Sequence, residues 1–223
     1  MAALVLSLFF VSSKCRADPQ TRDGIYVQLA SGLGWMSYRS TAHYAHGEPP
    51  NPYLEPTDYT NHQNGPGLTG SLLLGFQLRP RLALGVAGLA AAHAVSHPDG
   101  RDANGGGVTW HTDGGPYRKF LGTVGPFVDY YPSASCGWHV QALVGYASVG
   151  YADINSGAPN GIGLMAGVGH DWSVSDHWSI GALGRLVYAD THVAGVSYPE
   201  GGGMPSEHHS VLSPSLEVSF TYH

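Results

Sequence analysis

The sequence predicts an all-β protein, an eight-stranded antiparallel up-and-down transmembrane β-barrel. Three observations predict it. Large apolar residues alternate with small or polar ones over about ten positions, this pattern recurs eight times, and the connections between the recurrences are alternately long and short. Because successive side chains of a strand point to opposite faces, each segment has one apolar face and one small or polar face. Strands of this kind with such connections are typical of membrane barrels.

The composition supports a membrane barrel over a soluble β-sandwich. Charged residues make up 12% of the chain, against about 25% in ordinary soluble domains. Glycine is abundant, with 32 residues among 223. The sequence after the first residues contains no run of the roughly 18 apolar residues that a membrane helix requires. A formal net charge of −6 argues against nucleic acid as a partner.

The N-terminal residues have the pattern of a secretory signal. An apolar run extends from Ala2 to Val11, interrupted only by Ser7, and Cys15-Arg16-Ala17 provides a small-x-small cleavage site before Asp18. The run is too short to span a bilayer. We therefore expect residues 1–17 to form a signal peptide and residues 18–223 to form the outer-membrane β-barrel domain.

Each predicted strand is justified by its own alternation. In the first, Ile25, Val27 and Leu29 share one face, while Gln28 and Ala30 share the other. The last strand has the same pattern from Leu212 onward. In chain order the predicted strands are 24–38, 67–78, 82–94, 120–131, 139–151, 161–174, 178–189 and 211–222.

The connections alternate in length without exception. The long ones are polar and rich in Gly, Pro, Asn and His, and they span residues 43–65, 97–118, 153–160 and 192–209. The short ones are the turns at 79–81, 132–135 and 175–177. Membrane barrels have short periplasmic turns and long extracellular loops. This arrangement places four loops outside the cell and both termini on the periplasmic side.

The polarity of the two faces is the opposite of that in a soluble barrel. One face carries large apolar residues, and the other carries glycine, serine, threonine and ionisable groups. That second face would make a poor soluble core, but it suits a hydrogen-bonded lumen. Pro126 and Pro214 lie within predicted strands on the lipid-facing side, where each is expected to mark a bulge.

Aromatic residues near the strand ends support the membrane assignment. Such residues form girdles at the two membrane–water interfaces. The predicted interface aromatics are Trp35, Tyr38, Trp138, Trp172, Trp178 and Tyr188, with Tyr130 and Tyr131 nearby.

On these residues the chain resembles the small eight-stranded outer-membrane barrels of Gram-negative bacteria, the OmpA/OmpX/OmpW-like superfamily. The resemblance runs from about Gly24 to His223 and is carried by the opening segment 24–29, the segment 125–132 and the last strand. It implies an outer-membrane location and a porin-like barrel. It also implies that the last strand is a signal to the barrel-assembly machinery, through Leu216, Val218, Phe220 and Tyr222. His223 departs from the family pattern, in which the aromatic is terminal.

The inner face carries a predicted lumen charge network of Asp129, Asp171, Arg185 and Glu217. Further inward ionisable residues lie nearer the strand ends, and they are Arg79, His93 and His139. Arg185 and Glu217 lie on neighbouring predicted strands. Charges in a narrow lumen must pair, because an isolated buried charge is costly. An eight-stranded barrel is just wide enough for side chains to fill. We expect a structural plug, with a narrow ion path lined by the same groups as the alternative.

Other fragments allow weaker chemical interpretations. His208 and Ser210, with Glu217 or Glu207 as the acid, resemble a Ser/His/carboxylate hydrolase arrangement that small lipid A deacylases use. The loop from Asp99 to Gly105 lacks the distal ligand spacing of a calcium site. Histidines gather in the predicted loops, and surface metal binding or protonation near pH 6 is the alternative to solvated side chains. No pair of them has zinc-type spacing. They are His43, His46, His97, His111, His192, His208 and His209. We therefore expect no catalytic residue, no metal and no cofactor.

The predicted function is non-catalytic surface interaction. The barrel would display its extracellular loops to an unidentified ligand, with outer-membrane lipid, lipopolysaccharide and the assembly machinery as partners. The alternatives are a narrow pore for small solutes and a lipid A-modifying hydrolase.

Overall fold

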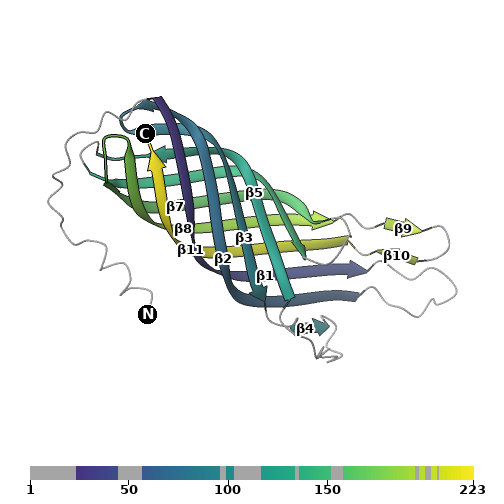
Figure 1. The fold of residues 1–223 in the computed structure, drawn as a ribbon. Helices are drawn as coiled ribbons and strands as arrows, with labels where there is room; N and C mark the ends of the chain where they lie inside the picture. The colour runs from purple at the N-terminus through teal and green to yellow at the C-terminus, as the bar shows by residue number, and fades with distance from the viewer. Residues whose placement is uncertain are drawn as a thin grey trace.

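Eight long antiparallel strands close into a barrel in the computed structural model (Figure 1). The structure describes residues 24–44, 57–95, 99–102, 117–133, 136–151, 158–193, 196–198, 202–204 and 206–223. The predicted signal peptide, residues 1–17, lies outside these ranges. Within them, no helix is long and apolar enough to cross a membrane.

The barrel strands follow one another around the wall, and the first pairs with both the second and the last. They are β1 (Gly24–Tyr44), β2 (Thr57–Arg79), β3 (Leu82–Val95), β5 (Tyr117–Tyr130), β6 (Trp138–Tyr151), β7 (Asn160–Ser173), β8 (Trp178–Val193) and β11 (Ser206–Tyr222). The three remaining strands are short. β4 (Asp99–Asp102) pairs with β2, while β9 (Val196–Tyr198) and β10 (Gly202–Met204) pair with each other. The predicted fold class is confirmed.

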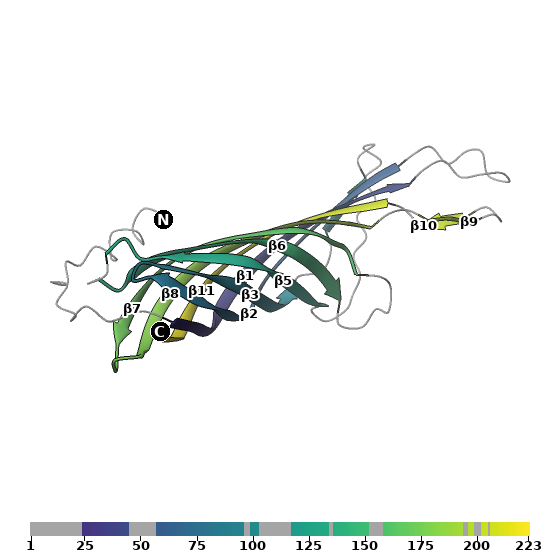
Figure 2. The same cartoon turned by 90° about the horizontal axis from the view of Figure 1, so that it is seen from above.

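The wall is taller on one side of the barrel than the sequence predicted. β1 and β2 remain paired as far as Tyr44 and Thr57, and β8 and β11 as far as Val193 and Glu207. The ends of β1, β2 and β11 project beyond β3 and β5 (Figures 1 and 2). The predicted loops 43–65 and 192–209 were therefore too long. Backbone pairing continues where the side chains no longer alternate in hydrophobicity. The hydrophobic alternation therefore ends before the strand does.

Large apolar side chains cover the outer face of the barrel. Leu33 and Leu216, which pair across β1 and β11, are 70% and 67% exposed. Along β1 the apolar outward positions run from Ile25 to Trp35, which matches the roughly 9–11 residues of a membrane-spanning strand. A closed barrel with this apolar belt is an integral membrane protein of the bacterial outer-membrane type.

The inner face is more apolar than the sequence pattern suggested. The polar positions are buried as expected, but a cluster of apolar side chains fills much of the remaining interior. Its larger members include Met36, Leu73, Leu121, Phe127, Leu143 and Met165. Leu73 lies between Leu72 and Leu74, so alternation alone could not separate it from the lipid-facing residues. The interior is therefore a mixed core.

Pro126 and Pro214 face outward without forming the expected bulges. Val124 pairs with Tyr146 and Phe127 pairs with Leu143, so the register of β5 with β6 is the same on both sides of Pro126. Pro214 likewise leaves the register of β11 with β8 unbroken. Each proline lacks an N–H donor. The missing hydrogen bond is accommodated without an extra residue in the strand.

Candidate functional site

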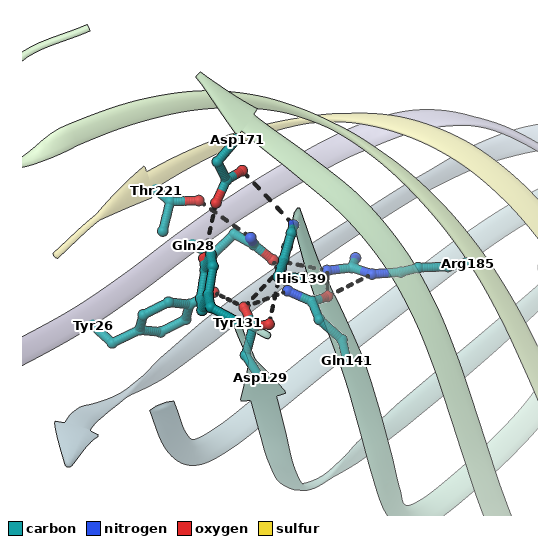
Figure 3. A network of polar contacts seen from close by, with 9 residues as sticks. All are labelled: Tyr26, Gln28, Asp129, Tyr131, His139, Gln141, Asp171, Arg185 and Thr221. Carbon is teal, nitrogen blue, oxygen red and sulfur yellow. Dashed lines mark hydrogen bonds and ion pairs between the residues drawn. The ribbon is translucent and has the colours of Figure 1, made fainter. Parts of the chain in front are cut away.

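A polar network crosses the lumen, and Figure 3 shows most of its members. It receives side chains from every barrel strand except β3. Its members occupy inward positions set by the two-residue period of their strands. They are Tyr26, Gln28, Ser71, Asp129, Tyr131, His139, Gln141, Asp171, Arg185, Ser215, Glu217 and Thr221. We call this set the lumen network.

Arg185 is the hub of the lumen network and is 3% exposed. Its guanidinium donates to Glu217 Oε2 at 2.7 Å and to Gln28 Oε1 at 3.0 Å. It also donates to Gln141 Oε1 at 2.9 Å and to the Ser71 hydroxyl. The planar guanidinium presents several donors in fixed directions. One side chain therefore joins β1, β2, β6 and β11 to β8.

The two aspartates lie on either side of His139. Asp129 accepts hydrogen bonds from Tyr26 Oη at 2.6 Å and from His139 Nδ1 at 2.8 Å. Asp171 accepts one from Tyr131 Oη at 2.8 Å, and its Oδ1 lies 3.8 Å from His139 Nε2. The Tyr131 and His139 rings stack with their centroids 5.0 Å apart. All four predicted lumen charges thus belong to one network. His139 was predicted to face inward nearer the barrel end, and the structure places it between the two aspartates. The sequence did not identify the two tyrosines as members.

Glycine makes room for this network at one crowded position. A Cβ atom added to Gly181 would contact Asp171 Oδ1 and Ser219 Oγ. By contrast, a Cβ atom on the lipid-facing Gly88 would have no neighbour within 4 Å.

Gly181→Ala is expected to destabilise the barrel by about 1–3 kcal/mol, because the added methyl displaces the Asp171 carboxylate. Urea unfolding of the protein in lipid vesicles, followed by tryptophan fluorescence, measures the effect. Gly88→Ala is the matched control and should remain within about 0.5 kcal/mol of the wild type. Equal stabilities for the two variants would contradict the tight packing around Asp171.

A second polar group, the upper cluster, consists of the buried residues Tyr38, Lys119 and His209 together with Glu207, whose side chain is partly exposed. Tyr38 Oη hydrogen-bonds with His209 Nδ1 at 2.5 Å, and Lys119 Nζ lies 2.7 Å from the centre of the Tyr38 ring. His209 Nε2 is 3.3 Å from Glu207 Oε2. Lys119 is fully buried, and its contact with the ring is a cation–π interaction.

The upper cluster corrects the prediction for Tyr38. This residue was expected at the membrane interface, but it is 3% exposed and points into the barrel. The physical reason is its even position on β1, where the outward residues are odd. The same correction applies to Tyr131, because its neighbour Tyr130 already occupies the outward position.

The other predicted interface aromatics lie on or near the outer surface. Trp35, Trp172 and Trp178 are each about half exposed, and Tyr188 is 39% exposed. Trp138 is partly covered and makes an edge contact with His170, the ring centroids being 5.0 Å apart. Their role as interface anchors stays a prediction.

The predicted assembly signal occupies the outer face of β11. Leu216, Val218 and Phe220 are exposed, and Tyr222 lies beside Trp178 with ring centroids 5.2 Å apart. His223 turns inward and contacts Tyr26 and Tyr131 at the barrel end. Recognition of this strand by the assembly machinery stays a prediction.

The outer wall carries a polar group, and the sequence predicted only some of its members. His208 Nε2 lies 2.8 Å from Asp190 Oδ1, and Ser210 pairs directly with Asp190 across β11 and β8. Glu217 instead points inward to Arg185, so it is not the acid beside His208. Asp190 was missed because it lies on the neighbouring strand, and the register that brings the two together is not visible in the sequence.

The remaining motifs lie only partly within the described residues. Asp99–Asp102 forms β4, and the rest of the considered calcium loop, residues 103–105, lies outside the described ranges, as do His46, His97 and His111. Among the side chains that the structure describes, no three His, Cys, Asp or Glu residues are placed to hold a metal ion.

Comparison with known proteins returns no matching family model and no matching curated protein. Among solved structures, the outer membrane protein OprG from Pseudomonas aeruginosa is 15% identical, with a TM-score of 0.49 over 92% of this chain and 99% of that chain. Neisserial surface protein A is 11% identical, with a TM-score of 0.46 over 89% and 96%. The outer membrane protease OmpT from Escherichia coli is 9% identical, with a TM-score of 0.39 over 94% and 99%. The fold is established by the strand pairing and polarity of this chain itself.

Proposed function

We propose that this outer-membrane barrel acts by surface display, holding its long connections outside the cell for contact with an extracellular ligand. The observation that carries the proposal is the polar extension of β1, β2, β8 and β11 above the apolar belt. Outward positions there are occupied by Arg39, His62 and His192 in place of leucine and tryptophan. Paired strands above the membrane give the loops a rigid base, and binding residues commonly lie on loops held by such scaffolds.

The filled lumen favours display over the alternative of a narrow pore. Lys119, Asp129 and Tyr131 have no exposed surface, although all three point into the barrel. The lumen network ties the strands together through hydrogen bonds to each carboxylate. In this proposal its role is structural, and no chemistry takes place inside the barrel.

The proposed partners follow from the same arrangement. The apolar belt contacts outer-membrane lipid, and the polar outer wall above it meets lipopolysaccharide headgroups. β11 is presented to the barrel-assembly machinery during insertion. Nucleic acid is not among the partners, because the chain is acidic, with a net charge of −6.

Surface labelling tests the proposed orientation and display. Single cysteines at Ser197, on β9, and at Asp176, in the turn between β7 and β8, are introduced into a Cys15→Ser/Cys136→Ser background. A membrane-impermeant maleimide applied to intact cells is expected to label the Ser197→Cys protein only. Permeabilised cells provide the control, in which both variants react.

Two outcomes would contradict the proposal. Labelling of the Asp176→Cys protein alone on intact cells would show that the barrel has the opposite orientation. Steady ion conductance by the reconstituted wild-type protein would favour the pore.

A further inference from the structure

Four polar residues gather on the outer wall at the top of the apolar belt. Arg39, Ser210 and Asp190 form one continuous cross-strand row over β1, β11 and β8. His208 lies two residues before Ser210 on the same face, with its Nε2 atom 2.8 Å from Asp190 Oδ1. Side chains directly opposite each other in a sheet have Cβ atoms about 5 Å apart, so the row is compact.

This group sits at the edge between the apolar and polar parts of the wall. Ile162 pairs with Asp190 on β7, and it is 63% exposed to lipid. Tyr188 and Leu212 lie one outward position lower on β8 and β11, and Tyr188 Oη contacts Asp190 Oδ2 at 3.4 Å. The group therefore lies at the depth where acyl chains join lipid headgroups, with hydrocarbon below and water above.

The contact with Asp190 orients the His208 ring. A carboxylate accepts hydrogen bonds and does not donate them, so Nε2 is the donor in this contact. In the neutral imidazole with its proton on Nε2, Nδ1 is a lone-pair acceptor. Ser210 lies roughly 7 Å along the strand from His208, measured between Cα atoms, on the same face. The structure shows no hydrogen bond between Ser210 and His208, and this bond has to form when a substrate binds, as it often does in catalytic sites.

The geometry points to a serine hydrolase site on the outer wall, with an acyl ester of an anionic outer-leaflet lipid as its substrate class. Ser210 is the nucleophile, His208 the general base and Asp190 the group that orients His208. Arg39, directly opposite Ser210, supplies the positive charge that binds the lipid phosphate or the developing oxyanion. The inference goes beyond surface display and does not depend on it.

The reaction needs only the lipid and water. Ser210 Oγ attacks the ester carbonyl carbon while His208 Nδ1 takes its proton, and the resulting tetrahedral intermediate expels the alcohol, which receives that proton. Water, deprotonated by the same nitrogen, then attacks the acyl-serine ester. The fatty acid leaves, and the proton returns to Ser210. The Asp190 carboxylate stabilises the imidazolium form of His208 during both steps.

An activated serine can be detected without knowing the natural lipid. The purified, folded barrel is treated with a fluorophosphonate probe, which reacts covalently with activated serines, and is also incubated separately with lipopolysaccharide and with phosphatidylglycerol vesicles. We expect probe attachment at Ser210 and fatty acid release from one of the two lipids, which identifies the source. Ser210→Ala should abolish labelling and lower release by roughly 10³-fold or more.

Matched variants separate catalysis from folding. Ser206→Ala removes a hydroxyl from the same face of β11, outside the proposed site, and should leave labelling and release unchanged. Asp190→Asn should lower release by roughly 10⁴-fold while the barrel still shows a boiling-dependent gel shift. A folded wild-type barrel that neither reacts with the probe nor releases fatty acid from either lipid would overturn the inference. Equal release by wild type and Ser210→Ala would overturn it as well.

Discussion

Arg185→Leu is expected to lower the free energy of unfolding by about 3–5 kcal/mol, because it leaves buried carboxylates without their cation. Arg185 contacts Glu217 at 2.7 Å, and the same network holds Asp129 and Asp171. Leucine fills part of the volume but offers no donor to Gln28 or Gln141. Urea unfolding in lipid vesicles, followed by tryptophan fluorescence, measures the change.

Two variants make this expectation specific to the buried ion pair. Arg81→Leu makes the same substitution at an exposed turn and should change stability by less than about 0.5 kcal/mol. The double variant Arg185→Leu/Glu217→Leu should be more stable than Arg185→Leu alone, since Glu217 is no longer an unpaired buried charge. If Arg185→Leu unfolds like the wild type, the lumen network does not stabilise the barrel.

The strand count and the two faces could be predicted because lipid and lumen impose a strict two-residue period. The period places Leu216 outward and Glu217 inward, which is where the structure has them. It also puts Arg185 and Glu217 on the inner faces of neighbouring strands. That adjacency requires only strand order, and strand order in an up-and-down barrel follows the sequence.

Contacts that depend on register or on distant strands could not be predicted. Asp190 and His208 meet across β8 and β11 because Ser210 pairs with Asp190, and a shift that paired Leu212 with Asp190 instead would separate them. The Tyr26–Asp129 hydrogen bond crosses the lumen between residues 103 positions apart. Barrel tilt and stagger decide which inward side chains meet, and the sequence pattern does not encode either quantity directly.

The error at Tyr38 has a different origin. Its position near the end of the first predicted strand suggested an interface aromatic, although its even number already placed it on the inner face. Parity is the stronger signal, because a strand side chain cannot change face without a shift of register. Residues above the membrane were the hardest to assign, since polar side chains on both faces remove the alternation while the backbone pairing continues.

Leu216→Arg is expected to lower the free energy of unfolding by about 2–4 kcal/mol, because it places a charge near the bilayer midplane. Leu216 is 67% exposed on the outer face of β11 and pairs with the equally exposed Leu33. The measurement is urea unfolding of protein refolded into vesicles, which avoids any effect of this residue on assembly in cells.

Ser206→Arg on the same face of β11 is the control, and its cost should be only about 0–1 kcal/mol, as at the membrane interface or above it. The comparison isolates depth in the bilayer, because both substitutions add the same side chain to one face of one strand. A soluble protein would give no such gradient, since both arginines would be in water. Equal effects of the two substitutions would therefore contradict the assignment of the apolar belt to the bilayer. They would also contradict the orientation on which surface display depends.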